Sequence, residues 1–389
     1  MPEEIQFIDS LETLILQDNP GIGGNLPNNM YKLSNLRVFS MYNCSLSGTL
    51  PEWVGIMKNL TSFGIGGNRL SGIIPSLIAS LTNLKVLGLA NNVLSADLNQ
   101  FETLTNLRYL YLESNIIQGS LTSSLLSSWN DMIELDISEN YLSSTLPADI
   151  FSPESLRLID LHGNRLTGSI PEVSKRGRNQ LKFLALHENE LEHVIPKSIG
   201  LLQTLTHLDL SMNRLASTLP STMGSMLHLE YLSLGSNSFS KSPIPTWLRG
   251  LTNLEQLILV ESRLQKTIPD FFGNYLSNLM HIDLSQDSLT STIPESIGKL
   301  AFLKALVLDG NELYGTADTV CDNLELEFFA ADCGGGENAS IECTCCTTCC
   351  AQEADEDCDE VKLYTSSSDH HDNVERSRYD LSQGPMFIP

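Results

Sequence analysis

Leucine and isoleucine return at short, fixed intervals along this chain, and residues 156–171, LRLIDLHGNRLTGSIP, show the intervals most clearly. The apolar positions are spaced by three residues and then by two, which fits a short strand with alternating buried side chains that runs into a turn. A single unit of this kind cannot bury its own apolar side. Stacked copies can, and their strands then pair into one sheet. The pattern therefore predicts a protein built from stacked repeats.

Copies of this unit fill most of the chain at a spacing of 23 to 25 residues. Thirteen positions begin a copy, namely Leu11, Leu36, Leu60, Leu84, Leu107, Met132, Leu156, Leu181, Leu205, Leu229, Leu254, Leu279 and Leu303. Asparagine recurs at a later position of most copies. Because a buried amide can donate to and accept from backbone groups of its turn, we interpret this column as structural. Segments such as residues 295–300 place apolar residues at helical spacing, which predicts short helical or 3-10 turns.

The text LxxLxLxxNxLxGxIP, over about residues 1–316, resembles the plant-type leucine-rich repeat of receptor-like proteins, receptor-kinase ectodomains and polygalacturonase-inhibiting proteins. The resemblance implies an α/β solenoid, a right-handed superhelix with a parallel concave β-sheet, short outer strands and 3-10 turns on the convex side. The run CTCCTTCC at residues 343–350 is similar to the tails of algal proteins with such repeats. Because one fold hosts many functions, the target must be inferred from the variable positions.

Composition divides the chain into five segments. The apolar period stops after residue 319, and the last residues are acidic, rich in serine and poor in apolar side chains, which predicts disorder there. The predicted segments are a partial repeat at residues 1–10, the repeat array at 11–319, a C-terminal cap at 320–333, a Cys-rich tail at 334–358 and a disordered acidic tail at 359–389.

Charge and targeting signals limit the classes of partner and the cellular locations that we expect. The chain carries 23 basic and 47 acidic residues, a net charge of −24, which argues against nucleic acid and anionic membranes as partners. No apolar run approaches the roughly 20 residues that span a bilayer. The first residues align with the middle of a repeat and contain no secretory signal, so we expect an array truncated at its N-terminus. A signal or anchor upstream would agree with the extracellular or cell-surface location that we expect.

Eight of the nine cysteines lie near the C-terminus, and an even number in a short stretch favours disulfides in an oxidising compartment. The disulfide candidates are Cys321, Cys333, Cys343, Cys345, Cys346, Cys349, Cys350 and Cys358. Their pairing stays open. A metal site is the alternative, but adjacent thiols crowd a tetrahedral zinc site and a second ligand pair is absent. Cys44 occupies the asparagine column and is expected to be a buried free thiol. Of three glycosylation sequons, those at Asn59 and Asn338 are the candidates, and the one at Asn43 is disfavoured.

Side chains between the leucines of each strand are expected to face solvent on the concave side. In the middle repeats these positions carry aromatic rings, carboxylates and imidazoles, which suit a protein or glycan surface because rings supply contact area and polar groups supply direction. The predicted partner-binding residues are Tyr109, Tyr111, Glu134, Asp136, Asp160, His162, Phe183, His187, His207, Asp209 and Tyr231. The competing interpretation is that Leu-Asp-Leu-Ser is ordinary repeat text with solvated aspartates.

Little in the chain indicates catalysis. No Ser/His/Asp set follows from the spacing, the glycine runs lack the lysine and helix of a phosphate loop, and kinase motifs are absent from the sequence given. We therefore predict no enzyme, no cofactor and no metal. A weak metal or pH-sensitive patch at His162 and His187 is a further alternative, which we disfavour because exposed ladders rarely converge on an ion.

The sequence predicts a non-catalytic recognition module, an extracellular ectodomain that binds a protein or glycan on its concave face. One alternative is a secreted inhibitor of a cell-wall hydrolase. Another is adhesion to ice or polysaccharide through outer-strand hydroxyl columns, whose members would be Thr49, Thr145, Ser169, Thr218, Thr267, Thr292 and Thr316. Threonine is common in strands for other reasons, which weakens this alternative.

Overall fold

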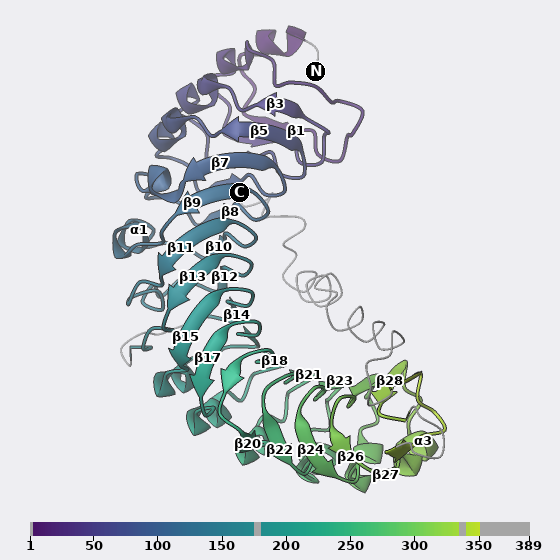
Figure 1. The fold of residues 1–389 in the computed structure, drawn as a ribbon. Helices are drawn as coiled ribbons and strands as arrows, with labels where there is room; N and C mark the ends of the chain where they lie inside the picture. Colours follow the sequence, from purple (N-terminus) through teal and green to yellow (C-terminus); the bar gives the residue numbers. More distant parts are fainter. Residues whose placement is uncertain (1–2, 175–179, 334–339, 351–389) are drawn as a thin grey trace. The chain divides into compact units, whose positions relative to one another are not determined.

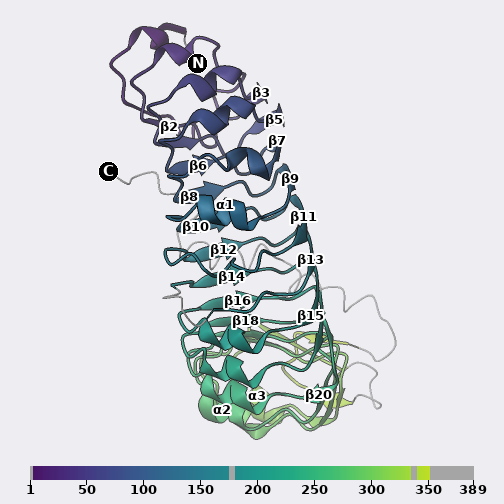
Figure 2. The ribbon, with the colours of Figure 1, turned by 90° about the vertical axis from the view of Figure 1, so that its left-hand side faces the viewer.

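The computed structural model describes residues 3–174, 180–333 and 340–350. The chain divides between Glu190 and Leu191 into two compact units, which are taken one at a time below. Each unit is a stack of repeats with an inner parallel sheet on one side and short helical turns on the other (Figures 1 and 2). The predicted α/β solenoid with parallel strands and 3-10 turns is confirmed.

The inner sheets consist mostly of three-residue strands, one from each repeat. In the first unit they are β1 (Thr13–Ile15), β2 (Val38–Ser40), β4 (Ser62–Gly64), β6 (Val86–Gly88), β8 (Tyr109–Tyr111), β10 (Glu134–Asp136), β12 (Leu158–Asp160) and β14 (Phe183–Ala185). In the second they are β16 (His207–Asp209), β18 (Tyr231–Ser233), β21 (Gln256–Ile258), β23 (His281–Asp283), β25 (Ala305–Val307), β28 (Phe328–Ala331) and β30 (Thr348–Cys349).

Equivalent positions of neighbouring repeats pair directly in the inner sheets. Leu135, for example, pairs with Leu110 on one side and with Ile159 on the other, and all three are fully buried. Burying one such side chain stabilises the fold by about 1.5–3 kcal/mol. The leucine period therefore produces a continuous apolar layer in which each repeat covers the next.

A ladder of asparagine side chains runs through the turns that follow most of the inner strands. In a typical repeat Asn164 donates from Nδ2 to the carbonyls of Ile137, Leu161 and His162 at 2.9, 3.1 and 3.1 Å. Its Oδ1 accepts from the amide of Leu142 at 2.8 Å. One side chain thus satisfies four backbone groups of two repeats, as the structural interpretation of this column requires.

Cys44 takes the asparagine position in its repeat. It is a buried free thiol, as expected, and its Sγ lies 2.8 Å from the carbonyl of Leu16. Burial raises the pKa of this thiol, so the thiolate needed for reactivity is disfavoured.

Outer strands follow the ladder and form separate sheets. They are β3 (Ser47–Thr49), β5 (Arg69–Ile73), β7 (Val93–Asp97), β9 (Ile116–Gly119), β11 (Tyr141–Thr145), β13 (Arg165–Gly168), β15 (Glu190–Val194), β17 (Arg214–Ser217) and β19 (Ser238–Phe239). A second set contains β20 (Ser242–Pro243), β22 (Leu264–Lys266), β24 (Ser288–Ser291) and β26 (Glu312–Leu313), and β27 (Gly315–Thr316) pairs with β29 (Ile341–Glu342).

In most pairs of outer strands, a residue does not pair with the residue at the same position of the next repeat but with one two residues earlier. Thr49 pairs with Ser71 and not with its equivalent Ile73, and Thr145 pairs with Thr167 and not with Ser169. A residue with positive φ in the strand accompanies the offset, such as Gly168 at φ 76°, where a Cβ would lie 2.7 Å from Thr145 Cγ2. Hydroxyl groups at the same position of successive repeats therefore do not lie side by side in these strands, so the prediction of straight hydroxyl columns is wrong here. The residue with positive φ shifts each strand along its neighbour.

The opposite side of each unit carries a short helical turn in most repeats, and none is found among the described residues of the repeats that begin at Met132 and Leu156. In the first unit these turns are η1 (Glu3–Phe7), η2 (Met30–Lys32), η3 (Glu52–Ile56), η4 (Ser76–Ser80), η5 (Leu98–Phe101) and α1 (Ser123–Ser128). In the second they are η6 (Lys197–Leu201), η7 (Ser221–Ser225), η8 (Thr246–Gly250), α2 (Phe271–Tyr275), η9 (Glu295–Lys299) and α3 (Asp318–Asn323). None of the helices among the described residues has the length and apolarity needed to cross a membrane.

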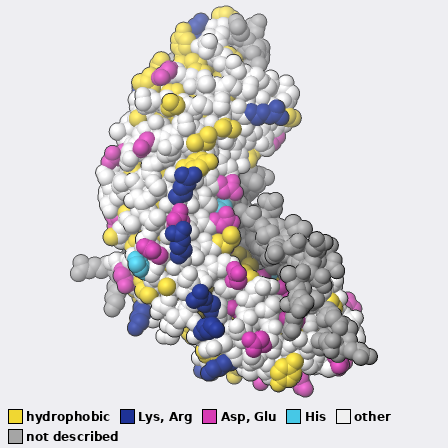
Figure 3. All heavy atoms as spheres, viewed as in Figure 1, with side chains coloured by type: hydrophobic (Ala, Val, Ile, Leu, Met, Phe, Trp, Pro, Cys, Tyr) yellow, Lys and Arg dark blue, Asp and Glu magenta, His cyan; other side chains and the backbone are white. Residues whose placement is uncertain are grey.

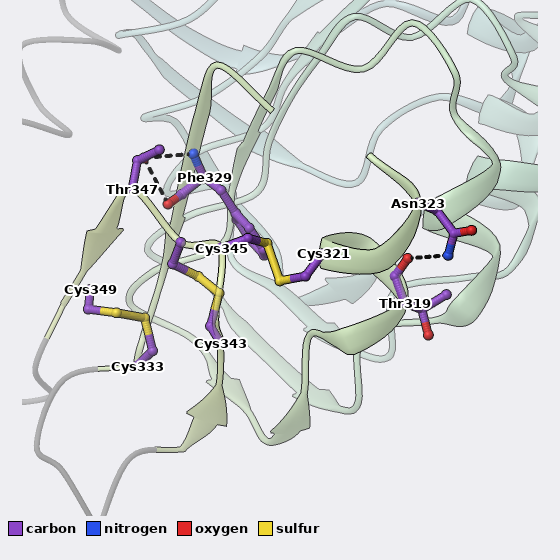
Figure 4. The surroundings of a disulfide bond; sticks show 10 residues. Thr319, Cys321, Asn323, Phe329, Cys333, Cys343, Cys345, Thr347 and Cys349 are labelled. Carbon is purple, nitrogen blue, oxygen red and sulfur yellow. Dashed lines mark hydrogen bonds between the residues drawn. A yellow bond between two sulfur atoms is a disulfide. The ribbon is translucent and has the colours of Figure 1, made fainter. Parts of the chain in front are cut away.

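The end of the second unit is held by disulfides (Figure 4). Cys321 pairs with Cys345, Cys333 with Cys349, and Cys343 with Cys346. Cys350 is disulfide-bonded as well, and Cys358 lies outside the described residues. The segments predicted as cap and Cys-rich tail thus contain the strands β28, β29 and β30. Phe329 of β28, the strand that pairs with β30, is fully buried. The acidic tail predicted at 359–389 also lies outside the described residues.

Candidate functional site

The predicted partner-binding residues all lie on inner strands or directly after them. Eight are in the first unit and three, His207, Asp209 and Tyr231, are in the second. The expectation that they face solvent is wrong for most of them. Asp160 is 1% exposed and His162 is 3% exposed, and Tyr111, Asp136, Phe183, His207, Asp209 and Tyr231 are also buried. Strand spacing of about 4.8 Å lets rings and carboxylates of adjacent repeats cover one another.

Buried Tyr111 and partly exposed Glu134 form a hydrogen-bonded pair across β8 and β10. The tyrosine hydroxyl donates to Glu134 Oε2 at 2.5 Å, and Tyr109 stacks on Tyr111 with ring centroids 6.5 Å apart. Burial raises the pKa of Tyr111, and the adjacent Glu134 carboxylate raises it further. Burial also raises the pKa of Glu134, while the hydrogen bond from Tyr111 and the charge of Arg157 oppose that rise. This pair therefore fixes both side chains in one orientation.

His162 and His187 stack face to face on neighbouring repeats, with ring centroids 4.3 Å apart and planes inclined by 8°. His162 Nδ1 lies 2.6 Å from Asp160 Oδ1, and its Nε2 lies 3.9 Å from Glu139 Oε1. Lone pairs of ring nitrogens lie in the ring plane, so two parallel rings do not aim them at a common ion. The stack therefore lacks the geometry of a metal site, and of its two rings only His187 is partly exposed.

The aspartates after the leucines are turn-forming residues. Asp136 Oδ1 accepts from the backbone amide and the hydroxyl of Ser138 at 3.1 and 2.6 Å, and Asp209 binds Ser211 in the same way. The competing interpretation, that the aspartates of Leu-Asp-Leu-Ser are ordinary structural residues of the repeat, therefore agrees with these hydrogen bonds. The aspartates are, however, buried and not solvated. The Asp-x-Ser spacing was the sequence signal for this turn.

In the second unit His207 stacks on Tyr231 with centroids 4.1 Å apart and planes inclined by 10°. The Tyr231 hydroxyl donates to Asp209 Oδ2 at 3.1 Å. As with Tyr111 and Glu134 in the first unit, a tyrosine hydroxyl donates to a carboxylate of the neighbouring repeat. In both groups of residues, ring stacking and a hydrogen bond between neighbouring repeats hold the side chains in place.

Three predicted residues, Tyr109, Glu134 and His187, are partly exposed, and we call them the inner patch. The exposed carboxylates Glu139 and Glu188 follow strands of the same unit. The inner patch is thus an aromatic and polar surface with an acidic border, supported from below by buried Tyr111 and His162.

The glycosylation candidates are only partly described. Asn59 is exposed, and its Nδ2 donates to the Ser34 carbonyl at 2.8 Å. Asn338 lies outside the described residues.

Comparison with known families agrees with this architecture. Models described as leucine rich repeat match residues 35–57, 58–117, 155–175, 203–264 and 252–313, which together make up more than half of the chain. No curated protein sequence matches the chain.

Solved structures with the same architecture include plant receptor ectodomains. The ectodomain of the receptor kinase GASSHO1/SCHENGEN3 from Arabidopsis thaliana, in complex with CASPARIAN STRIP INTEGRITY FACTOR 2, is 28% identical with a TM-score of 0.71 over 88% of this chain. The ectodomain of the Arabidopsis receptor kinase HAESA, in complex with an IDA peptide hormone ligand, is 26% identical with a TM-score of 0.67 over 85% of this chain. The chain spans 45% and 60% of those two structures.

A plant ice-binding protein is also similar, at 28% identity and a TM-score of 0.50. That match covers 60% of this chain and 74% of the other.

Proposed function

The chain is a leucine-rich repeat protein, and on that premise we propose that it is a non-catalytic recognition module that binds a peptide segment of a partner protein. The surface that we assign to this role is the inner patch of the first unit. The observation that carries the proposal is the pairing of partly exposed Tyr109 and Glu134 with a buried, hydrogen-bonded Tyr111. A surface held in place before binding loses little conformational entropy when a ligand arrives.

The chemistry of the inner patch favours a particular kind of peptide. Tyr109 and His187 offer partly exposed rings, on which guanidinium groups and aliphatic side chains pack. Glu134, Glu139 and Glu188 add negative charge around them. An extended peptide with Arg or Lys residues between apolar ones therefore complements this surface. The solved relatives bound to a peptide hormone support the peptide class.

The setting proposed for this activity is outside the cell. Three disulfides among the described residues of the second unit are typical of proteins exposed to an oxidising environment. Relatives of similar fold are receptor ectodomains, which accords with this placement.

Binding selection on the full chain tests the proposal. A displayed library of random peptides is selected on the wild-type protein, and each binder is then measured on Tyr109→Ala/His187→Ala. These two positions are partly exposed, so far-UV circular dichroism should not change. We expect enriched peptides to carry Arg or Lys and to lose about tenfold or more in affinity on the variant.

A control variant excludes general surface effects. Tyr275→Ala removes an exposed ring from α2 in the second unit, where 58% of the residue is accessible, and should leave every affinity unchanged. Binders that respond equally to both variants, or to neither, would refute the inner patch as the binding surface.

Adhesion to ice is the second candidate, because a plant ice-binding protein has a similar fold over 60% of the chain. The two-residue offset of the outer strands places Val93 beside Ser71 and Ile116 beside Ser95, which breaks up the hydroxyl columns. Thermal hysteresis of the full chain at millimolar concentration would favour this candidate over peptide recognition.

A further inference from the structure

The outer sheet of the second unit is interrupted at one place. Strand β19 ends at Phe239 and β20 begins at Ser242, so that β15, β17 and β19 belong to one sheet and β20, β22, β24 and β26 to another. The repeat that starts at Leu229 is 25 residues long, whereas the one before it has 24. The break therefore coincides with an inserted residue near Lys241.

A pocket of about 320 Å³ opens beside this break. Its lining residues are Ser236, Asn237, Lys241, Glu261, Arg263, Gln286, Asp287 and Ser288. Lys and Arg side chains gather in dark blue over β20 and β22 on this face (Figure 3). Its volume is at the lower end of the range for small-molecule sites, so it accommodates one small ligand or one residue of a larger one.

Two cationic side chains line this pocket without an ion pair. Among the described residues, neither Lys241 nor Arg263 has a side-chain hydrogen bond or salt bridge, whereas Glu261 accepts a hydrogen bond from the Ser236 hydroxyl at 3.1 Å. A guanidinium presents a planar fork that matches a carboxylate, and an ammonium adds a second positive charge. The pocket therefore offers a ligand two positively charged groups whose N–H donors are not used within the part of the protein that the structure describes.

The asparagine ladder is also broken at this pocket. Ser262 and Asp287 replace asparagine in two successive repeats, and neither supplies the amide that elsewhere donates to three carbonyls. Asp287 Oδ1 still accepts from the Leu264 amide at 2.9 Å, but its Oδ2 and the Ser262 hydroxyl have no hydrogen-bond partner. Of these two residues only Asp287 lines the pocket, so its wall contains one carboxylate with an unpaired oxygen.

We propose that this pocket binds a sugar acid, a ligand that carries a carboxylate together with several hydroxyl groups. Arg263 and Lys241 bind the carboxylate, and Ser236, Gln286 and Ser288 exchange hydrogen bonds with the hydroxyls. The pocket is built from the ladder and outer strands of the second unit, so this site is independent of the inner patch.

Asp287 makes the binding depend on pH. Burial raises its pKa to about 7, and the buried carboxylate of Asp283 adds to the rise, against backbone hydrogen bonds from Leu264, Ser262 and Arg263. The charged groups that face it in the pocket are Lys241, Glu261 and Arg263. Protonated Asp287 does not repel an anion, and ionised Asp287 does. Affinity for the ligand should therefore increase as the pH falls from 8 to 6.

Calorimetry on the full chain with three probes tests the proposal. Glucuronate carries both groups, glucose carries the hydroxyls alone, and acetate carries the carboxylate alone. We expect glucuronate to bind more tightly than either of the others. Equal binding of glucose, or no binding of glucuronate at millimolar concentration, would overturn the proposal. Methyl β-D-glucuronide, whose C1 is substituted, separates two sources: binding equal to that of glucuronate indicates a residue within a glycan, and weaker binding indicates the free acid.

Three variants localise the effect. Arg263→Gln should reduce glucuronate affinity about tenfold, the usual magnitude for one charged hydrogen-bonding group. Arg249→Gln, at an exposed position of η8 outside the pocket, changes the net charge equally and should have no effect. Asp287→Asn should retain binding and remove its dependence on pH. Equal losses in the first two variants, or unchanged pH dependence in the third, would show that the site is elsewhere.

Discussion

The hydroxyl of Tyr111 donates to Glu134 Oε2 at 2.5 Å across two neighbouring inner strands. Removing that donor leaves a largely buried carboxylate with one partner fewer. We expect Tyr111→Phe to lower the free energy of unfolding by about 1–3 kcal/mol, the cost of an unsatisfied buried acceptor. Urea denaturation measures it. Tyr109→Phe is the control, because the Tyr109 hydroxyl has no hydrogen bond among the described residues, and it should change stability by less than about 0.5 kcal/mol.

Asp287→Asn should stabilise the second unit, and more so at high pH. The folded-state pKa of Asp287 is raised from 3.8 to about 7, so folding favours the protonated form. The stability associated with that form is complete below pH 3.8 and is lost as the pH rises toward 7. Asparagine does not titrate and restores the missing amide. We expect a gain of about 1–3 kcal/mol at pH 8 and a smaller one at pH 5, measured by thermal unfolding at both values.

The reverse change tests the same reasoning in a regular repeat. Asn311 donates to the carbonyls of Leu284, Leu308 and Asp309, so Asn311→Asp removes three hydrogen bonds. This variant should be less stable than wild type, with a larger deficit at pH 8 than at pH 5. A deficit independent of pH would contradict the account of Asp287.

Asn164→Ala should be among the more damaging single substitutions in the first unit. It leaves the carbonyls of Ile137, Leu161 and His162 and the amide of Leu142 without their side-chain partner. We expect a loss of about 2–4 kcal/mol in urea denaturation. Asn106→Ala is the matched control: Asn106 is exposed and makes one bond, to the Thr82 carbonyl at 2.7 Å, so its loss should be under about 1 kcal/mol.

The disulfides should contribute unequally. Cys333–Cys349 closes a separation of 16 residues and ties the turn after β28 to β30, whereas Cys343–Cys346 closes a separation of three. A longer closed loop restricts the unfolded chain more, so Cys333→Ser/Cys349→Ser should cost about 3 kcal/mol and Cys343→Ser/Cys346→Ser clearly less. Differential scanning calorimetry of both variants decides the order, and an inverted order would refute this explanation.

Much of the inner architecture could be predicted from the chain. Strand positions, the asparagine column and the helical turns follow from apolar spacing, because burial with period two or three to four is a local property. The burial of Asp160 and His162 could not be predicted in this way. It depends on which rings and carboxylates adjacent repeats bring within one strand spacing.

The pocket beside Lys241 is an intermediate case. Its sequence signals, a lengthened repeat and the replacement of asparagine by Ser262 and Asp287, are visible in the chain. Neither signal shows that the charges of Lys241, Arg263 and Asp287 line one pocket. That juxtaposition joins residues about 20 to 50 positions apart in the chain, so it exists only once the repeats are stacked.

The amino-acid sequence by itself determined that this chain stacks repeats of about two dozen residues, since hiding each row of leucines requires a neighbour on either side. Only the tertiary structure decided how the cysteines pair, how far the outer strands slide past one another, and which polar side chains lie buried. These outcomes depend on backbone geometry at left-handed residues such as Gly168 and on contacts between repeats, and neither is encoded in the spacing of apolar positions.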